Sequence, residues 1–251
     1  FKNTAYIFNS IYLAEKPQQG KYYLLQHFKG WIIETDENFF DPYKATLMDF
    51  RMGQGHGTTF VYVLPLSETK ALVEYTLFTE NLLAKSEYDD AVREYVKTFL
   101  KLSKYNITDE EFGVIPMTNA TFPGYKNGMY YIGTAGGQTK ASTGYTFRFI
   151  QKQADTIVKE LLKNKISIKL EQPGKRFYFY DSTLLHILSK NLLAGKVIFS
   201  TLFKKNRAST VLRFLDNETT ILEEIKLLNS LPKKIFAKAG LQELIKMMRG
   251  S

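Results

Sequence analysis

The sequence predicts an α+β fold, because strand-like and helix-like patterns occupy different parts of the chain. Residues 31–78 hold short runs rich in β-branched and aromatic residues, separated by turn residues at intervals typical of an antiparallel meander. Helical spacing of apolar residues dominates from residue 145 onward. The 251 residues are 44% hydrophobic and 24% charged, which excludes a disordered chain and suffices for one large core or two modest ones.

The individual elements follow from local patterns. Expected strands are apolar runs bounded by turn residues, and expected helices have apolar residues three and four apart. The first helix has Ser86 as a plausible N-cap with Asp89 three residues later, and residues 171–175 suggest a boundary. The expected strands are 5–10, 31–35, 45–51, 58–64, 71–78, 113–117 and 129–132, and the expected helices are 86–102, 145–162, 182–193, 196–205, 221–228 and 241–248.

Several classes of site are excluded by residue types and spacings. Cysteine is absent, which removes disulfides, thiolate metal sites and thiol nucleophiles and fits a reducing compartment. His27, His56 and His186 lie far apart without ligand spacing, so we predict no metal site. No Gly-x-Ser-x-Gly motif occurs, and no run of about 18 uncharged apolar residues predicts a membrane-spanning helix. Residues 53–57, Gly-Gln-Gly-His-Gly, are interpreted as a hairpin loop because no helix follows them.

The net charge of +9 is distributed unevenly. Residues 1–150 carry 15 Lys+Arg and 16 Asp+Glu, whereas residues 151–251 carry 19 and 9, a net of +10. In the basic part, Lys190, Lys196, Lys204, Lys205 and Arg207 surround the apolar runs 184–188 and 197–199. Such helices either lie in an anionic membrane interface or pack their apolar faces together and leave the lysines solvated. Nucleic acid is less favoured, because the basic residues alternate with aliphatic rather than exposed aromatic stretches.

A glycine-rich turn at residues 133–144 connects an expected strand to an expected helix. Backbone N–H groups and the positive end of a helix dipole would meet there, an arrangement that suits a phosphate or another anion. The same glycines also suit a tight strand-to-helix connection, and the pattern alone favours neither reading.

Glu74 stands out because period-two alternation puts it on one strand face with Leu72, Thr76 and Phe78. If that face is buried, desolvation raises the pKa of the carboxyl and leaves a protonated acid near neutral pH. The pattern alone favours the solvent face of an edge strand. Asp49 and Arg51 also share a face and would form a pair on the sheet surface.

Several segments, in their order and spacing, resemble the bacterial lycopene cyclase family, in particular its Bacteroidetes-type members. The resemblance extends from about residue 5 to about residue 240. The matching stretches are Gln-His-Phe-Lys-Gly-Trp at 26–31, Ala-Thr-Leu-Met-Asp-Phe-Arg at 45–51, Phe-Val-Tyr-Val-Leu-Pro-Leu-Ser at 60–67, Ala-Leu-Val-Glu-Tyr-Thr at 71–76, Gly-Val-Ile-Pro-Met at 113–117 and Gly-Thr-Ala-Gly-Gly-Gln-Thr-Lys-Ala-Ser-Thr-Gly-Tyr-Thr-Phe at 133–147.

The resemblance implies a flavoprotein of the glutathione-reductase-like type that makes the β-rings of carotenoids. Reduced FAD would be used without net redox change, and NAD(P)H would serve to reduce the flavin. A proton is added to the acyclic end of lycopene, the tertiary cation closes a ring, and a second proton is lost. The implied domains are 1–30 and 107–165 for the remaining part of the FAD-binding domain, 31–106 for an antiparallel substrate sheet with a helix, and 166–251 for a basic helical C-terminal region.

The resemblance also implies roles for particular residues. Glu74 aligns with the essential acidic position, and Tyr75 stands where many relatives have a second acid. Asp49 and Arg51 are secondary catalytic candidates, and the aromatic residues Phe60, Tyr62 and Tyr75 are candidates for cation stabilisation. The implied flavin-contacting residues are Gly133, Thr134, Gly136, Gly137, Thr143 and Gly144, with Thr134 at a position where related flavoproteins often have Asp.

Members of the family begin with a strand, a Gly-x-Gly-x-x-Gly turn and a helix that bind the ADP half of FAD. The present sequence starts at Phe1 without this turn, so we expect an N-terminally truncated chain that is inactive alone and binds FAD weakly or not at all. The expected location is cytoplasmic and peripheral to the membrane, with lycopene and an anionic lipid surface as partners and no metal or nucleic acid. The alternatives are another FAD-dependent enzyme of this superfold, a hydroxylase or prenyl reductase, and a non-catalytic membrane-binding module.

Overall fold

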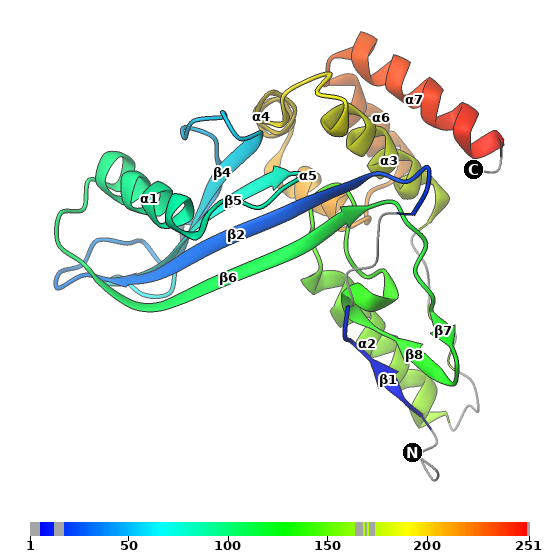
Figure 1. Ribbon diagram of the computed structural model, residues 1–251, viewed down its shortest axis with the longest axis horizontal. Helices are drawn as coiled ribbons and strands as arrows, with labels where there is room; N and C mark the ends of the chain where they lie inside the picture. The colour runs from blue at the N-terminus through cyan, green and yellow to red at the C-terminus, as the bar shows by residue number, and fades with distance from the viewer. Residues whose placement is uncertain (1–5, 13–17, 164–167, 169, 171–173, 250–251) are drawn as a thin grey trace. The chain divides into compact units, whose positions relative to one another are not determined.

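The computed structural model describes residues 6–12, 18–163, 168, 170 and 174–249. The chain divides into two compact units. The first, here called the helical unit, comprises Phe1–Tyr23, Pro116–Leu193 and Thr201–Ser251. The second, here called the sheet unit, comprises Leu24–Ile115 and Ala194–Ser200. Each unit is described by itself (Figure 1).

The sheet unit is built on five strands in the order β3-β4-β5-β2-β6 (Figure 1). Strand β3 pairs antiparallel with β4, and β4 pairs antiparallel with β5, as a meander requires. Strand β2, however, pairs antiparallel with β5 rather than with β3, so the meander prediction was wrong for the first strand. The strands are β2 Tyr23–Glu34, β3 Thr46–Asp49, β4 Thr58–Pro65, β5 Lys70–Thr79 and β6 Asn106–Thr118.

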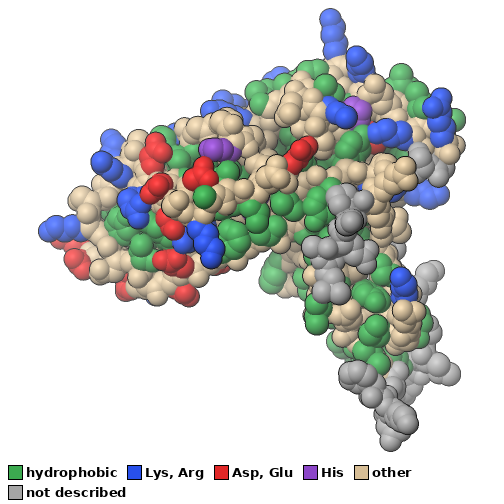
Figure 2. Space-filling model, in the orientation of Figure 1, with side chains coloured by type: hydrophobic (Ala, Val, Ile, Leu, Met, Phe, Trp, Pro, Cys, Tyr) green, Lys and Arg blue, Asp and Glu red, His purple; other side chains and the backbone are tan. Residues whose placement is uncertain are grey.

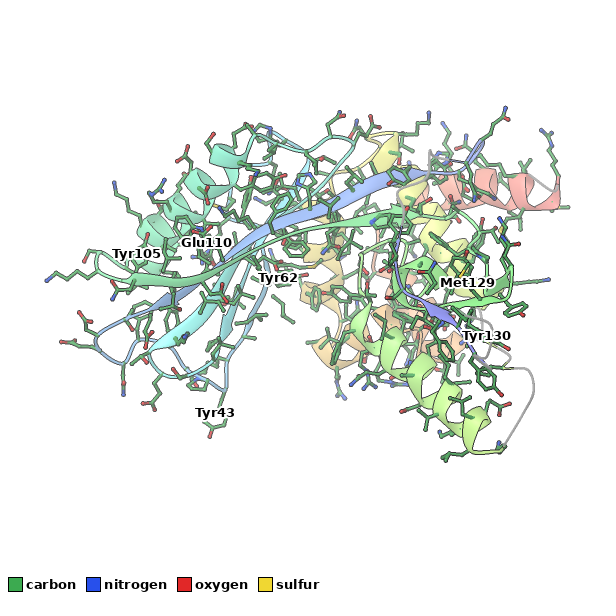
Figure 3. The ribbon with its side chains drawn as sticks, turned by 60° about the horizontal axis from the view of Figure 1, so that its bottom comes forward. Tyr43, Tyr62, Tyr105, Glu110, Met129 and Tyr130 are labelled. Atoms are coloured by element: carbon green, nitrogen blue, oxygen red, sulfur yellow. The ribbon has the colours of Figure 1, made fainter. Side chains whose placement is uncertain are left out.

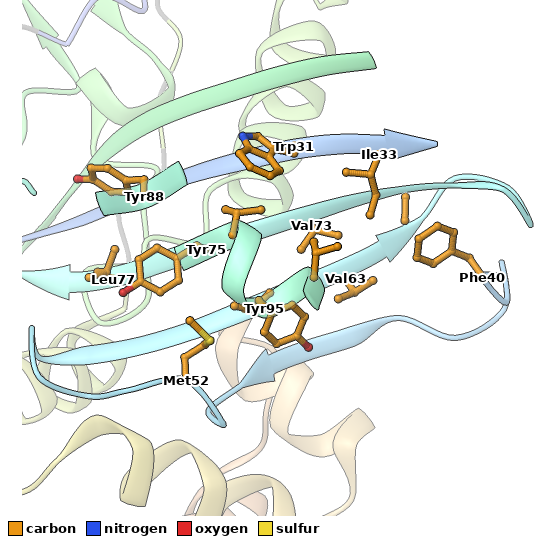
Figure 4. Close-up of a cluster of buried hydrophobic side chains, with 14 residues drawn as sticks. Trp31, Ile33, Phe40, Met52, Val63, Val73, Tyr75, Leu77, Tyr88 and Tyr95 are labelled. Atoms are coloured by element: carbon orange, nitrogen blue, oxygen red, sulfur yellow. The ribbon is translucent and has the colours of Figure 1, made fainter. Parts of the chain in front are cut away.

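One face of this sheet is covered by the helix α1, Lys85–Tyr95, and the turn of π-helix η1, Val96–Leu100 (Figure 4). Alternate apolar residues of β2, β4 and β5 pack against it, because successive side chains of a strand point to opposite faces. The core cluster consists of Trp31, Ile33, Phe40, Met52, Val61, Val63, Ala71, Val73, Tyr75, Leu77, Tyr88, Val92, Tyr95 and Val96.

The start of α1 differs from the prediction. The N-cap is Ala84 rather than Ser86, and the Glu87 carboxylate accepts a hydrogen bond from the Ala84 amide at 2.8 Å. Asp89 is not part of this cap, because it turns toward the sheet, where it pairs with Lys29 at 2.5 Å. It also accepts a hydrogen bond from the Trp31 indole at 3.2 Å. Asp89, which the sequence suggested as part of the helix cap, thus links α1 to β2.

The helical unit contains a small sheet in the order β1-β8-β7 and most of the helices (Figure 1). Strand β1 is parallel to β8, so two segments more than a hundred residues apart in sequence lie side by side. The remaining elements are β1 Phe8–Asn9, β7 Tyr125–Lys126, β8 Met129–Tyr131, the 3-10 helix η2 Gly133–Gly136, α2 Phe147–Leu162, α3 Lys175–Ser189, α4 Gly195–Lys205, α5 Ala208–Leu215, α6 Ile221–Asn229 and α7 Lys233–Met248.

Several helix boundaries differ from the predictions. Helix α3 begins at Lys175, directly after Gly174, seven residues earlier than expected, and α7 begins after Pro232, eight residues earlier. Helix α5 was not predicted, although its apolar residues Val211, Phe214 and Leu215 are buried at helical spacing. Of the expected boundary at 171–175, only Gly174 and Lys175 are among the described residues.

Most residues of the two apolar runs in the basic region are buried, although Val197 is 44% exposed. Leu185, Ile187 and Leu188 of α3 are buried, and so are Ile198 and Phe199 of α4. The surrounding lysines Lys190, Lys196, Lys204 and Lys205 are exposed. For these buried residues the packing interpretation is confirmed, and binding of the basic region to a membrane remains a prediction.

The predicted domain boundaries near residues 30 and 106 do not match the two units. The boundary near 30 cuts through β2, and the segment after 106 is β6, which lies beside β2 in the same sheet. Residues 194–200 also belong to the sheet unit, so the region from 166 onward is not a separate body. The assignment of one unit to the flavin and the other to the substrate remains a prediction.

Candidate active site

The sheet has a second face, opposite α1, and Glu74 lies on it. The antiparallel register puts Tyr62 of β4 and Gly30 of β2 directly beside Glu74 on either side. Phe60 lies one pair further along, beside Thr76. Residues paired in this way share a sheet face. Figure 3 labels Tyr62 of β4 and Glu110 of β6, which both belong to the sheet unit.

Glu74 is half-buried, and its surroundings favour the protonated form. Desolvation by burial and the neighbouring Glu111 carboxyl raise the pKa of Glu74 to about 8. The Thr76 hydroxyl donates a hydrogen bond of 2.7 Å to Glu74 Oε1, which works in the opposite direction because it stabilises the anion. Strand β5 lies between β4 and β2, so the edge-strand interpretation was wrong, and the face that carries Glu74 is partly withdrawn from water.

Glu111 is a residue that the sequence analysis missed. It lies on β6, and its Oε1 atom would be only 2.9 Å from a Cβ added at Gly30. Its side chain therefore crosses the glycine toward Glu74. A carboxylate pair formed across three strands has no signature in local sequence, although a glycine in the middle of a long strand is a known sign of close approach.

Aromatic rings flank the acid on the same face. The Phe60 ring makes edge-to-face contacts with Tyr62, centroids 5.3 Å apart, and with Phe78, centroids 5.2 Å apart. Of the three aromatic candidates, Phe60 and Tyr62 share the face of Glu74. Tyr75 lies on the opposite face, in the core under α1, where its ring meets Tyr88.

Asp49 and Arg51 are not brought together with Glu74. Asp49 is paired with Val61, on the face covered by α1, and accepts a hydrogen bond of 2.7 Å from the Tyr95 hydroxyl. Arg51 binds the same carboxylate through Nε at 2.8 Å and lies over the Phe99 ring. Burial opposes ionisation of Asp49, but the hydrogen bonds from Arg51 and Tyr95 outweigh it and hold the pKa below its ordinary value. The expected pair is confirmed, and it joins β3 to η1.

The glycine-rich segment forms η2 and the loop before α2. Gly133, Gly137 and Gly144 have φ values of 60°, 75° and 70°, which favour glycine. At Gly136 an added Cβ would clash with the Tyr131 carbonyl oxygen. The glycines are thus required by the chain's own conformation, and by themselves they do not indicate a ligand.

Polar groups of the same segment point more directly to a ligand. The Thr143 hydroxyl is buried and has no hydrogen-bond partner within the described chain, and the Gln153 side-chain nitrogen is in the same condition. Gln153 Oε1 accepts a hydrogen bond of 2.9 Å from the Gly133 amide. Thr134 contacts Thr139 through its hydroxyl at 3.1 Å.

A cavity of about 600 Å³ lies in the helical unit beside this segment. Gly137, Thr139 and Lys140 line it, together with Tyr178 of α3. The Lys140 ammonium is buried and forms an ion pair of 2.9 Å with Asp181. A volume of this size suits part of a large cofactor.

The histidines have structural partners. His27 is buried between the Tyr88 and Thr79 hydroxyls, and burial lowers its pKa to about 4. His186 contacts Tyr22 and Glu243, and His56 lies in the loop of residues 53–57, which no helix follows, as predicted. Among the described residues, no cluster of His, Asp and Glu side chains could hold a metal ion.

The chain is similar to solved structures at low sequence identity. A geranylgeranyl bacteriochlorophyll reductase-like protein from Thermoplasma acidophilum is 12% identical, with a TM-score of 0.50 over 85% of this chain and 54% of its own. A flavin-dependent brominase is 13% identical, with a TM-score of 0.38 over 80% of this chain and 53% of its own. This chain thus spans about half the length of the structures it matches. No curated protein sequence matches it.

The chain has an α+β fold that is similar to the fold of this reductase-like protein, and one face of its five-stranded sheet carries an acidic residue. The model of the lycopene cyclase protein family matches residues 5–239. The chain belongs to the lycopene cyclase family, as the sequence resemblance indicated.

Proposed function

We propose that this chain carries the catalytic acid of a lycopene β-cyclase, which isomerises the acyclic ends of lycopene to β-rings. The observation that supports it most is Glu74, a carboxyl kept protonated near neutral pH on a sheet face lined by aromatic rings. Protonation of an isolated alkene needs an acid that still holds its proton at the working pH and is shielded from water.

The chemistry follows from the residues on that face. Glu74 donates its proton to the terminal double bond, and the tertiary cation that results is attacked by the next double bond, which closes the six-membered ring. Phe60 and Tyr62 lie on the same sheet face as the acid, and their rings would stabilise the cation. Loss of a proton from a ring carbon restores neutrality, so atoms and electrons balance without oxidation.

The residues of the glycine-rich segment fit a flavin. The cavity lined by Gly137 and Lys140 has room for part of FAD. Thr143 and Gln153 do not line it, but each has a buried polar atom without a hydrogen-bond partner among the described residues. When bound, reduced FAD would act without net redox change, and NAD(P)H would serve to reduce it. Gly133, Thr134, Gly136, Gly137, Thr143 and Gly144 are the residues that we assign to this cofactor within a glutathione-reductase-like domain.

An anionic membrane surface is the second partner that we propose, because lycopene dissolves in lipid. Helix α7 has two faces: Ala239 and Glu243 are buried, and α7 packs on α3. The opposite stripe of Leu241, Leu244 and Met248 is 59%, 47% and 80% exposed. Figure 2 shows hydrophobic side chains beside Lys and Arg in the region of α7. Such a stripe with a basic rim is typical of helices that lie in a lipid interface.

Among the described residues, no helix is long and apolar enough to cross a membrane.

A prenyl reductase is the second candidate, because the fold is similar to that of a geranylgeranyl reductase-like protein. A reductase adds a hydride and a proton across the double bond and consumes NAD(P)H in proportion to product, whereas a cyclase forms rings without net consumption of NAD(P)H and depends on the Glu74 proton. The experiment is therefore Glu74→Gln in the complete gene product, expressed in a lycopene-accumulating bacterial host with pigments separated by chromatography. We expect β-rings with the wild type and at least a hundredfold loss with the variant.

Two controls sharpen this experiment. Glu94→Gln changes an exposed carboxyl on α1 and should leave ring formation unchanged. A wild type that consumes NAD(P)H in proportion to product, with the same turnover in Glu74→Gln, would favour the reductase instead.

A further inference from the structure

Because Gly30 has no side chain, space is left above β2 on this sheet face, between Glu74 of β5 and strand β6. In the ladder Gly30 is paired with Glu74, and β6 lies on the other side of β2. An added Cβ at Gly30 would come within 2.7 Å of Leu72 Cδ1 and within 2.9 Å of Glu111 Oε1. Both side chains therefore occupy the space that any other residue at position 30 would fill.

The alternation of β6 directs Glu111 to this face. Its neighbour Glu110 pairs with Lys29 at 2.9 Å, and Phe112 meets the ring of Tyr88, both on the face covered by α1. Glu111 points the opposite way, as successive strand residues must. The Lys29 ammonium is thus directed to Glu110 and Asp89 and not to Glu111.

The groups that face Glu74 come from each neighbouring strand. They are Thr76 on β5, Tyr62 on β4, Gly30 on β2 and Glu111 on β6. None is a lysine or arginine, and no cation acts on the pKa of Glu74 within the described chain. The nearest charged group is a second carboxyl.

Two neighbouring carboxyls with no cation beside them hold one proton between them, because ionising both would bring two negative charges together. We propose that Glu111 is a positioning residue that shares a single proton with Glu74 and so keeps Glu74 in its acid form at neutral pH. The catalytic purpose of this proton sharing rests on the proposed cyclase function. The sharing itself rests only on the positions and charges of the two side chains.

The pair would serve both proton steps of the cyclisation. When Glu74 gives its proton to the alkene, the two carboxylates together carry two negative charges beside a carbocation. The ring carbon then loses a proton to Glu74, the C–H electron pair forms the ring double bond, and the pair again holds one proton. No oxidant, reductant or outside base is needed.

The first test does not depend on activity. Carbon-13 NMR of the glutamate-labelled protein would follow the carboxyl of Glu74 from about pH 4 to about pH 10, with Glu74→Gln used to assign its signal. We expect Glu111→Gln to lower the pKa of Glu74 by about one unit, because a like charge is removed. Gly30→Ala should act in the same direction, because its methyl group displaces the Glu111 carboxyl without changing any charge. Glu110→Gln is the matched control and should have no effect.

The second test measures ring formation by the complete gene product on lycopene in liposomes as a function of pH. In Glu111→Gln the alkaline limb of the profile should move down by about one pH unit, with a fivefold to tenfold loss at about pH 8 and less at about pH 6. A purely structural role would lower the rate equally at all pH values.

The outcomes separate the two proposals. A wild type that cyclises lycopene with a pH profile unchanged by Glu111→Gln and Gly30→Ala would overturn the carboxyl pair and leave the function standing. A shifted titration of Glu74 in a protein that forms no rings would support the pair and remove the cyclase.

Discussion

At the scale of single residues, Glu74 illustrates how position decides the chemistry of a side chain. The same strand has a carboxyl on one face and the fully buried Val73 and Leu77 on the other. Glu111 and burial act together on the acid, and Thr76 opposes them. A carboxyl in such surroundings stabilises the folded state less than an exposed one does, which is common at functional sites.

This gives a prediction for stability. The pKa of Glu74 is higher in the folded state, about 8, than in the unfolded chain. Between the two values only the folded state holds the proton, so stability falls as pH rises through this window. Glu74→Gln removes that loss and should make the protein about 2 kcal/mol more stable than the wild type at about pH 9, with little difference at about pH 4.

Urea denaturation of the two proteins across this range measures the difference. Glu94→Gln, which alters an exposed carboxyl of the same unit, should follow the wild type at every pH. A constant difference between Glu74→Gln and the wild type would mean that Glu74 titrates normally.

The face of Glu74 could be predicted from the sequence, but its neighbours could not. Alternation along β5 grouped it with Leu72, Thr76 and Phe78, and the register agrees. Glu111 depends on β6 lying beside β2, a contact between segments about eighty residues apart. Asp49 was a secondary catalytic candidate because of the family pattern, whereas the bulge between Thr46 and Asp49 directs it to α1.

At the scale of elements, helix α7 is held to α3 by one polar cluster. Glu243 Oε1 accepts hydrogen bonds from the Tyr22 hydroxyl at 2.6 Å and from Lys246 at 2.8 Å, and lies 2.9 Å from His186 Nδ1. The carboxyl is almost fully buried. Burial opposes ionisation, but Lys246, Tyr22 and His186 outweigh it and hold the pKa of Glu243 below its ordinary value.

Glu243→Gln should therefore destabilise the helical unit by about 2 kcal/mol at neutral pH. Because the folded-state pKa is depressed, the stabilisation exists above the ordinary pKa of glutamate and is lost as pH falls through the folded value. The gap between variant and wild type should close below about pH 4. Thermal melts at several pH values measure this, and Asp155→Asn on the exposed surface of α2 is the control.

The elements themselves could be predicted where local pattern decides them. Strands β4 and β5 and helix α2 were located within two residues, because their apolar periodicity is strong. The order of strands was not, because the pairing of β2 with β5 is set by packing over the whole sheet. Helix α5 was missed because eight residues give a weak periodic signal.

At the scale of the whole molecule, the uneven distribution of charge is clear from the sequence, but the function of the basic region is not. The basic residues of α3 and α4 surround buried apolar runs, so the net charge of +10 over residues 151–251 does not by itself mark a membrane surface. The apolar residues that remain exposed at helical spacing belong to α2, α6 and α7. Only the three-dimensional packing separates the two kinds of helix.

The proposed membrane surface on α7 is tested by vesicle flotation of the protein. We expect binding to vesicles rich in phosphatidylglycerol, weaker binding to phosphatidylcholine, and release by salt, because the lysines attract anionic lipid. The double variant Leu241→Gln with Leu244→Gln should bind about tenfold more weakly, since it removes apolar area without changing charge. Val158→Gln with Leu162→Gln alters two apolar residues of α2 that are 53% and 79% exposed and should bind as the wild type does. Equal loss of binding in both double variants would mean that general surface hydrophobicity, and not α7, drives the association with vesicles. Self-association of the wild type at the same concentration would mean that the stripe on α7 is a contact between copies of the chain.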